Sequence, residues 1–265
     1  MKLKLLIFST FRNLFLFVLF LGMIQKVSSQ ELYVGANAEL FLAKDAVFTT
    51  NNTVVQVDDN GTFSLEAGSN WGSEMEFVAG LVKVIGTGKT NLPTGDNGVY
   101  APVTMDHTGD VTAKYSNTAP SDGTNGTDVD AVSNIEFWEL TGTAVVTLPW
   151  NESSDITSLV NNNGGALSSV SIVGLNGGVW DLISASRSYT VSGDLLNGSV
   201  TSDLNNQVDL NGYAQYTFGI DHQIVLSVND LFRSTGISLL SNPVKAIEEN
   251  VRFSTSGEIV DLKVS

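Results

Sequence analysis

The 265-residue sequence contains no cysteine, two histidines, and 13 Lys and Arg residues against 28 Asp and Glu residues. The absence of cysteine excludes disulfide bonds, thiol catalysis and cysteine-ligated metals. Positions 1–29 hold four of the basic residues and no acidic residue, so the remainder of the chain carries 9 basic and 28 acidic side chains, a net charge of −19. Such a chain is a poor partner for nucleic acid, and an anionic membrane surface repels it.

Residues 1–29 have the composition of a secretory signal peptide. Basic residues, among them Lys2 and Arg12, precede a long apolar run, and small residues lead to an expected cleavage point between Ser29 and Gln30. The alternative is a transmembrane anchor, but 13 residues separate Arg12 from the next charged residue, whereas a spanning helix needs about 20. No other run approaches that length, so we expect an exported chain without an integral membrane segment after signal removal.

The rest of the sequence consists of short alternating runs separated by turn residues. Asn-Gly pairs occur seven times, and this pair favours the type I′ turns of β-hairpins. Residues 54–65, with Asn60-Gly61 between two such runs, predict a hairpin. In residues 144–150, alternate side chains share one apolar face, as in a half-buried strand. Helical periodicity is limited to about two turns at 153–160. The pattern predicts an all-β fold, a β-sandwich.

Composition divides the chain into four segments. They are a signal peptide at 1–29, an N-terminal β-region at 30–88, a β-sandwich domain at 89–222, and a linker and tail at 223–265. The short strands of the N-terminal β-region predict either hairpins or a small solenoid. The sequence leaves open whether this region packs onto the sandwich, and it leaves open the oligomeric state. Residues 116–134 are rich in Gly, Asp, Asn and Thr and predict a long surface loop.

The C-terminal segments 226–231, 237–245 and 258–264 resemble the start of the type IX secretion C-terminal sorting domain, a small β-sandwich on exported proteins of Bacteroidota. Asn242-Pro243 is similar to the Tyr-Pro-Asn-Pro entry of that family. The resemblance implies an incomplete C-terminal β-sandwich tail that is recognised by the secretion machinery.

The middle of the chain is similar to a β-sandwich type that is common in the same exported proteins. The similarity rests on the Pro-x-Gly-Asp-Asn-Gly-x-Tyr-x-Pro segment at 93–102, on Trp138-Glu139-Leu140, and on the strand at 148–151. It implies an adhesin-like surface protein and no catalytic residues.

The sequence stops at Ser265, before the Gly-Lys/Arg turn and the final strands that the sorting-domain family uses. Either the sequence is a fragment or the product is not sorted across the outer membrane. The expected location is the medium or the outer cell surface, and the periplasm if the tail does not function.

The sequence contains no set of motifs that together indicate a catalytic site. Residues 86–90 resemble half of a phosphate-binding loop, but Lys83 stands where the full motif requires Gly, so a hairpin turn is the better interpretation. Glu136 and Glu139 lie on opposite faces of one predicted strand, so we expect solvated acids and not a pair for glycoside hydrolysis. His107 and His222 are expected at the surface, although a two-histidine metal site formed by folding stays open. We therefore expect no enzymatic activity.

Calcium is the ion that the sequence suits best. The side chains of Asp122, Asn125, Asp128 and Asp130 crowd one Gly-rich loop, and hard oxygen ligands suit Ca²⁺. The spacing does not match an EF-hand, and a solvated acidic loop without an ion is the alternative. No other cofactor is expected.

Among the four tryptophans, Trp138 and Trp150 fit a sandwich core, whereas Trp71, between Asn70 and Gly72, is a candidate exposed platform for stacking a sugar. Two main functions follow. The leading hypothesis is a non-enzymatic surface protein, structural or adhesin-like, that binds surface glycans or other surface proteins. The alternative is a carbohydrate-binding module of the cell surface, and a secreted hydrolase ranks third.

Overall fold

We analysed a computed structural model of the chain, which describes residues 32–48, 54–71, 76–163, 165–184, 187–222, 237–239, 250–255 and 258–263. The chain divides into two compact units, Met1–Asp221 and His222–Ser265. This division falls one residue before the predicted start of the tail. Both units consist mainly of strands, with a single α-helix in the described part of the chain, and the predicted all-β class is confirmed.

The N-terminal β-region is a small solenoid. Its first coil consists of β1 (Leu32–Val34), β2 (Glu39–Leu42) and β3 (Val47–Phe48), and its second of β4 (Val55–Val57), β5 (Thr62–Glu66) and β6 (Asn70–Trp71). A third coil begins with β7 (Val78–Ala79) and β8 (Val82–Ile85). Each strand pairs in parallel with its equivalent one coil away, so that Leu32 is in register with Val55, and Val55 with Val78.

The predicted hairpin at 54–65 is therefore wrong, since β4 and β5 pair with other coils and not with each other. The backbone of Asn60 does adopt the positive φ, 66°, that the turn prediction requires, and Asn37 in the preceding coil has a φ of 60°. Asn tolerates this conformation at any tight corner. Here the corner at Asn60 connects β4 to β5 within one coil. Each of these two strands forms its backbone hydrogen bonds with strands of the neighbouring coils.

The second region is a sandwich, and one of its two sheets has the order β20-β21-β17-β12-β9, with β22 beside β17. The strands are β9 (Gly88–Leu92), β12 (Val103–His107), β17 (Thr143–Trp150), β20 (Thr190–Gly193), β21 (Gly198–Thr201) and β22 (Val208–Asp209). In β17 the residues Ala144, Val146, Leu148 and Trp150 are all buried, which confirms the predicted alternation. The segment before β9 is a turn as expected, but it joins strands of different sheets and is not a paired hairpin.

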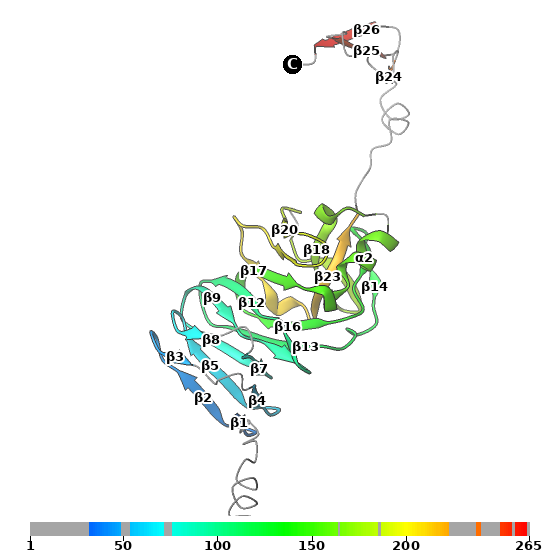
Figure 1. The fold of residues 1–265 in the computed structure, drawn as a ribbon. Helices are drawn as coiled ribbons and strands as arrows, with labels where there is room; N and C mark the ends of the chain where they lie inside the picture. Colours follow the sequence, from blue (N-terminus) through cyan, green and yellow to red (C-terminus); the bar gives the residue numbers. More distant parts are fainter. Residues whose placement is uncertain are drawn as a thin grey trace, which may run out of the picture. The chain divides into compact units, whose positions relative to one another are not determined.

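The other sheet has ten strands, nine of them in the order β14-β19-β18-β23-β16-β13-β8-β5-β2, and it runs from the sandwich into the solenoid (Figure 1). Its sandwich strands are β13 (Val111–Ser116), β14 (Thr124–Asn125), β15 (Val129–Val132), β16 (Phe137–Thr141), β18 (Val170–Asn176), β19 (Val179–Leu182) and β23 (Tyr216–Asp221). At the junction β8 pairs antiparallel with β13, with Val84 opposite Val111. The solenoid thus packs onto the sandwich edge to edge.

Large aromatic side chains fill the space between the two sandwich sheets. Trp138 is fully buried, and its ring centroid lies 5.5 Å from that of Phe218, which is 5.9 Å from that of Trp150. The core positions predicted for Trp138 and Trp150 are confirmed. A second, smaller core consists of Val129 of β15, Val173 and Leu175 of β18, and Trp180 of β19. The predicted surface loop at 116–134 therefore contains two short strands and a buried valine.

The one described α-helix, α2 (Ile156–Asn162), follows the 3-10 turn η1 (Glu152–Ser154). The helix predicted at 153–160 is present but begins three residues later, at Ile156. Asp155 is its N-cap, and its side chain accepts a hydrogen bond from the backbone N–H of Ser158 at 3.3 Å. Two further 3-10 turns are η2 (Leu167–Ser169) and η3 (Leu210–Gly212).

The C-terminal unit contains a three-stranded antiparallel sheet of β24 (Ile237–Leu239), β25 (Asn250–Thr255) and β26 (Glu258–Lys263). The predicted sorting residues Asn242 and Pro243 lie outside the described residues, as do Ser29 and Gln30 at the expected cleavage point. A helix both long and apolar enough to cross a membrane is not found among the residues that the structure describes.

Candidate functional site

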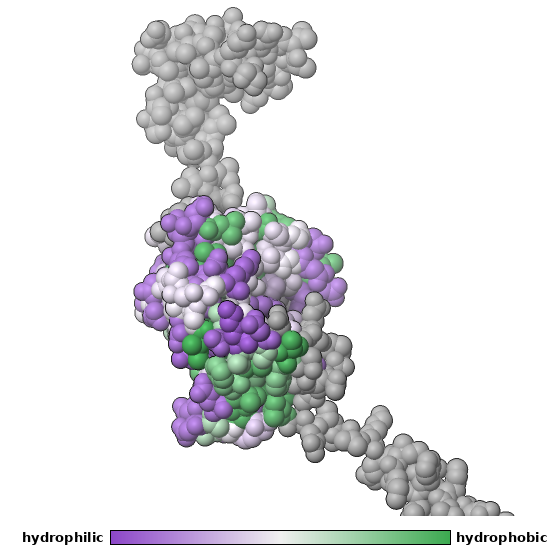
Figure 2. All heavy atoms as spheres, turned by 90° about the vertical axis from the view of Figure 1, so that its left-hand side faces the viewer, coloured by the Kyte–Doolittle hydropathy of each residue, from purple (hydrophilic) through white to green (hydrophobic). Residues whose placement is uncertain are grey.

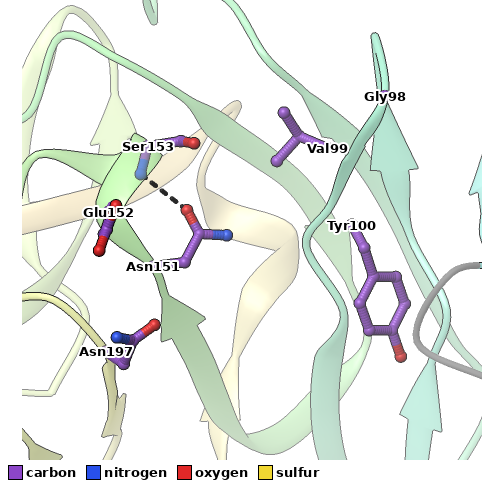
Figure 3. A pocket seen from close by; sticks show the side chains of 7 residues that line it. All are labelled: Gly98, Val99, Tyr100, Asn151, Glu152, Ser153 and Asn197. Carbon is purple, nitrogen blue, oxygen red and sulfur yellow. Dashed lines mark hydrogen bonds between the residues drawn. The ribbon is translucent and has the colours of Figure 1, made fainter.

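A hollow on the sandwich is open to solvent and has a volume of about 530 Å³. Figure 3 shows how three separate segments surround it. Its lining residues come from one hairpin, from the turn after β17, and from the loop between β20 and β21: Gly98, Val99, Tyr100, Asn151, Glu152, Ser153 and Asn197. Residues 98–100 and Asn151 belong to two of the three motifs that carry the resemblance of the middle region, 93–102 and 148–151.

The first wall is the hairpin of β10 (Gly95–Asp96) and β11 (Val99–Tyr100). Asn97 and Gly98 form its two-residue turn with φ values of 50° and 81°, and the positive signs at both positions are those of a type I′ turn. The Asp96 carboxylate accepts hydrogen bonds from the backbone N–H of Asn117 and from the Asn97 side-chain amide, both at 3.1 Å. These contacts fix the hairpin so that Tyr100 lies along one side of the hollow.

The second wall is η1, which begins immediately after β17. The Asn151 side chain accepts a hydrogen bond from the backbone N–H of Ser153 at 2.8 Å, and the Asn151 N–H donates to the Ser154 hydroxyl at 3.3 Å. This reciprocal capping box holds the turn. It leaves the Asn151 side-chain amide nitrogen and the exposed Glu152 carboxylate at the hollow (Figure 3).

The third wall is the loop that joins β20 to β21 and carries Asn197. The Asp194 carboxylate accepts hydrogen bonds from the backbone N–H groups of Leu196 and Asn197 at 2.8 and 2.9 Å, and these bonds lower the pKa of Asp194. Beneath the loop, the indole N–H of Trp150 donates to the Asp194 carbonyl at 2.9 Å. A side chain at Gly198 would collide with the Trp150 ring, so glycine is required there.

A buried carboxyl lies under the second wall. Glu136 is 2% exposed, and its carboxylate accepts a hydrogen bond from the Tyr115 hydroxyl at 2.5 Å. Burial raises the pKa of Glu136, while hydrogen bonds from Ser154 and Tyr115 oppose that shift in part. The expectation that Glu136 is a solvated surface acid is wrong, because its side chain points into the core beside Trp138. Glu139 is exposed as expected.

The hollow offers amide, carboxylate and hydroxyl groups beside one aromatic ring. Asn and Gln amides donate and accept, and a carboxylate accepts two hydrogen bonds, so such a set pairs with neighbouring hydroxyl groups on a ligand. The Tyr100 ring supplies an apolar surface with a polar end. The volume falls in the range of small-molecule sites, and the lining combines polar groups with apolar surface.

Trp71 does not provide the predicted exposed platform. Its ring stacks on Phe48 with centroids 5.1 Å apart, and it meets Phe63 edge to face at 5.4 Å. Its indole N–H donates to the Glu76 carbonyl at 2.6 Å. The ring therefore closes one corner of the solenoid core. Of the two flanking residues on which the prediction depends, Asn70 lies in β6 and Gly72 lies outside the described residues.

The four predicted calcium ligands do not converge on one point. Asp122, Asn125, Asp128 and Asp130 are all exposed. Asp128 is paired with Arg187, and the Asn125 side chain donates to the backbone carbonyl of Asp130 at 3.0 Å. Among the described residues no group of three or more His, Asp or Glu side chains could hold a metal ion. Calcium binding stays a prediction that the geometry does not support.

The two histidines have different environments. His107 is 1% exposed, with Nδ1 donating to the Gly109 carbonyl at 2.7 Å and Nε2 3.4 Å from the Thr90 hydroxyl. The predicted surface position is wrong for His107, because β12 turns this residue toward the core. His222 is exposed.

The fold defines an all-β protein in which a solenoid extends one sheet of a sandwich, with a separate three-stranded tail. Comparison with protein-family models gave no match, and neither the curated proteins nor the solved structures gave a significant match to the chain.

Sequence reasoning does not identify the hollow. Asn97-Gly98 and Asn197-Gly198 are both turn signals, but neither indicates a site by itself. The signal that the sequence does contain is the recurrence of turn residues at 97–100, 151–153 and 197–198, with Tyr100 and Glu152 among them. Their convergence depends on which strand ends meet at one edge of the sandwich, and no local pattern encodes that.

Proposed function

We propose that this chain is an exported, non-enzymatic surface protein that acts by adhesion, and that the hollow bounded by Tyr100, Asn151 and Asn197 is its point of attachment. The observation that supports the proposal is the construction of the hollow from three separately braced turns on a rigid sheet scaffold. Loops held by a rigid scaffold are where proteins commonly place binding groups. The basic and apolar segment at 1–29 and the tail resemblance support export by a type IX route.

The ligand that fits the hollow is the second part of the proposal. A carbohydrate-binding role is favoured by one observation: Tyr100 and the polar residues Asn151, Glu152 and Asn197, from three separate segments, line the same open hollow. An aromatic surface covers the apolar face of a sugar ring, and amide and carboxylate groups bind its hydroxyls. An open hollow also admits one unit of a longer chain, as an attachment site on a surface polysaccharide requires.

The binding experiment uses the purified mature chain, residues 30–265, on a panel of immobilised glycans. The expected result is binding that Glu152→Gln or Asn197→Ala weakens by roughly ten-fold, since each removes a polar contact in a solvent-exposed site. The matched control is Glu139→Gln, an exposed carboxylate on β16 and away from the hollow lining, which should bind as the wild type does. Equal loss in the control would contradict the site.

Two further experiments test the remaining parts. Incubation with a panel of polysaccharides and peptides should give no hydrolysis above a boiled control, and turnover would overturn the non-enzymatic proposal. Fractionation of the native cells with an antibody should find the protein at the surface or in the medium. Confinement to the periplasm would contradict sorting by the tail and redirect the search to periplasmic ligands.

A further inference from the structure

The first coil of the solenoid ends in an open edge. Among the described residues, β1, β2 and β3 each pair with one strand of the second coil and with nothing on the other side. Edge strands present unpaired N–H and C=O groups, and proteins commonly protect them with charged residues, proline or a covering segment. Residues 32–48 contain no proline and three charged residues, Glu39, Lys44 and Asp45. The edge is thus weakly protected.

One column of the solenoid core is open at this edge, although Val34 and Leu42 of the same coil are buried. Leu32, Val55 and Val78 occupy one inward-facing column, and their exposed fractions are 37%, 0% and 0%. The column is therefore fully covered wherever another coil follows and open where none does. A further layer of strands against β1 would cover Leu32 and continue the column.

Exposed apolar side chains are concentrated in the same coil. Six large hydrophobic side chains are exposed in the described residues, and four of them belong to residues 32–48: Leu32, Tyr33, Phe41 and Val47. Figure 2 shows hydrophobic residues gathered over the lower part of the described body, where Figure 1 places β2 and β3. A concentrated apolar area on an acidic protein is typical of an interaction surface.

Charge favours a second copy of this chain as the occupant. The mature chain carries a net charge of −19, which separates two copies, but residues 32–48 contribute only −1 of it. Two copies that meet here keep most of their negative charge apart. A basic partner would find stronger attraction elsewhere on the molecule. A second copy related by a two-fold axis also presents the same coil edge to this one.

The chain upstream of Leu32 is short once the proposed signal peptide is removed. Export with cleavage after Ser29 leaves only Gln30 and Glu31 before β1, whereas a whole coil takes the chain from Leu32 to Val55. Gln30 and Glu31 alone do not supply a covering layer. This step rests on the proposed export and not on the ligand of the hollow.

We propose that the open edge of the first coil, β1–β3, is the interface of a two-fold symmetric dimer of this protein. Under a two-fold axis β1 of one copy lies antiparallel to β1 of the other, and Leu32 of both copies becomes buried. The interface is isologous and closed, so it produces dimers and no longer assemblies.

Sedimentation equilibrium of the mature chain over a wide range of concentrations tests the proposal. The expected result is a reversible monomer–dimer equilibrium that tightens with salt, because salt screens the repulsion between two acidic copies. Val47→Lys or Phe41→Asp should raise the dissociation constant by roughly ten-fold or more, since a charge is then buried without a partner. On dimer formation, amide hydrogen exchange should slow in β1 and β2.

Matched controls come from the other exposed hydrophobic residues. Leu204→Lys, at 62% exposure, is the control for Val47→Lys at 66%, and Leu196→Asp, at 50%, is the control for Phe41→Asp at 51%. The controls should leave the dimer unchanged, and circular dichroism should show all four variants folded. A monomer at every concentration, equal weakening by the controls, or growth beyond a dimer would each overturn the proposal. Glycan binding at the hollow is measured separately, so failure of one proposal does not affect the other.

Discussion

The solenoid and the sandwich share one sheet but are ordered by different means. In the solenoid every strand pairs in parallel with the equivalent strand of the next coil, as β1 pairs with β4 and β4 with β7. In the sandwich the pairs are mostly antiparallel and some join distant segments, as Leu148 on β17 pairs with Val200 on β21. Repetition fixes the register in the first case, and matched apolar faces fix it in the second. One sheet therefore contains both the parallel pairs of the solenoid and the antiparallel pairs of the sandwich, and the two kinds meet at β8, which pairs with β13.

The largest expected effect comes from emptying either core. Trp138→Ala in the sandwich and Phe63→Ala in the solenoid each remove a fully buried ring and should each lower the free energy of unfolding by roughly 3–5 kcal/mol. Because one sheet crosses both regions, we expect a single transition in urea for each variant, followed by circular dichroism. Two separated transitions would show that solenoid and sandwich unfold independently.

A smaller effect should distinguish the corners of the solenoid from the turns of the sandwich. Gly80 has a φ of 139°, and a Cβ there would lie 2.6 Å from Cβ of Val57 in the preceding coil, so Gly80→Ala should cost roughly 2–3 kcal/mol. Gly177, in the β18–β19 turn, has a φ of 57° and open space around it. Gly177→Ala should cost only about 1 kcal/mol. Similar losses in thermal unfolding would contradict the close stacking of the coils.

Glu136 and Asp110 should give opposite pH dependences. Burial raises the pKa of Glu136 above its ordinary value of 4.5, so the ionised carboxylate opposes folding at pH values above its folded pKa and the cost disappears below 4.5. Glu136→Gln should therefore stabilise the protein relative to the wild type, and the gain should grow as the pH rises from 4.5 through the folded pKa of Glu136. The exposed control Glu139→Gln should show no trend. A gain independent of pH would exclude ionisation as the cause.

The smallest effect is expected at Asp110, which is half exposed. Hydrogen bonds from the Gly86 N–H and from Lys83, both at 3.1 Å, lower its pKa below 3.8. Its stabilising contribution is therefore present above pH 3.8 and is lost as the pH falls through the folded pKa. Asp110→Asn should cost less than about 1 kcal/mol at neutral pH, because solvent screens the pair. Urea unfolding at low pH should show no difference from the wild type.

The sandwich is the more predictable of the two regions. Alternation at 144–150 identifies β17 and its buried face, and the sizes of Trp138 and Trp150 indicate their core positions, because a half-buried strand has a period of two. The hairpin at Asn97-Gly98 follows from the same turn chemistry. The position of Glu136 is not predictable, since its burial depends on Tyr115 from another strand.

The sequence does not decide between hairpins and a solenoid for the N-terminal β-region, and the reason is physical. Equivalent positions in successive coils need similar shape and polarity but not identical residues. Val34 matches Val57 and Leu42 matches Leu65, whereas Phe48 is replaced by Trp71 in the same stacked position. Asn has a positive φ both in the hairpin, at Asn97, and in the coil, at Asn60, so the Asn-Gly pair does not by itself distinguish the two structures. The choice between them is made by neighbours one coil away, which a local pattern does not contain.

The hollow and the open coil edge lie on parts that the junction of β8 with β13 joins into one body. The coils stack on the side of β8 that faces away from β13, so each coil, such as the interval from Leu32 to Val55, extends the stack and leaves the pairing of β8 with β13 unchanged. Each added coil would lengthen the body by about 4.8 Å, the distance between paired strands. The number of coils therefore determines the length of the solenoid along its stacking direction.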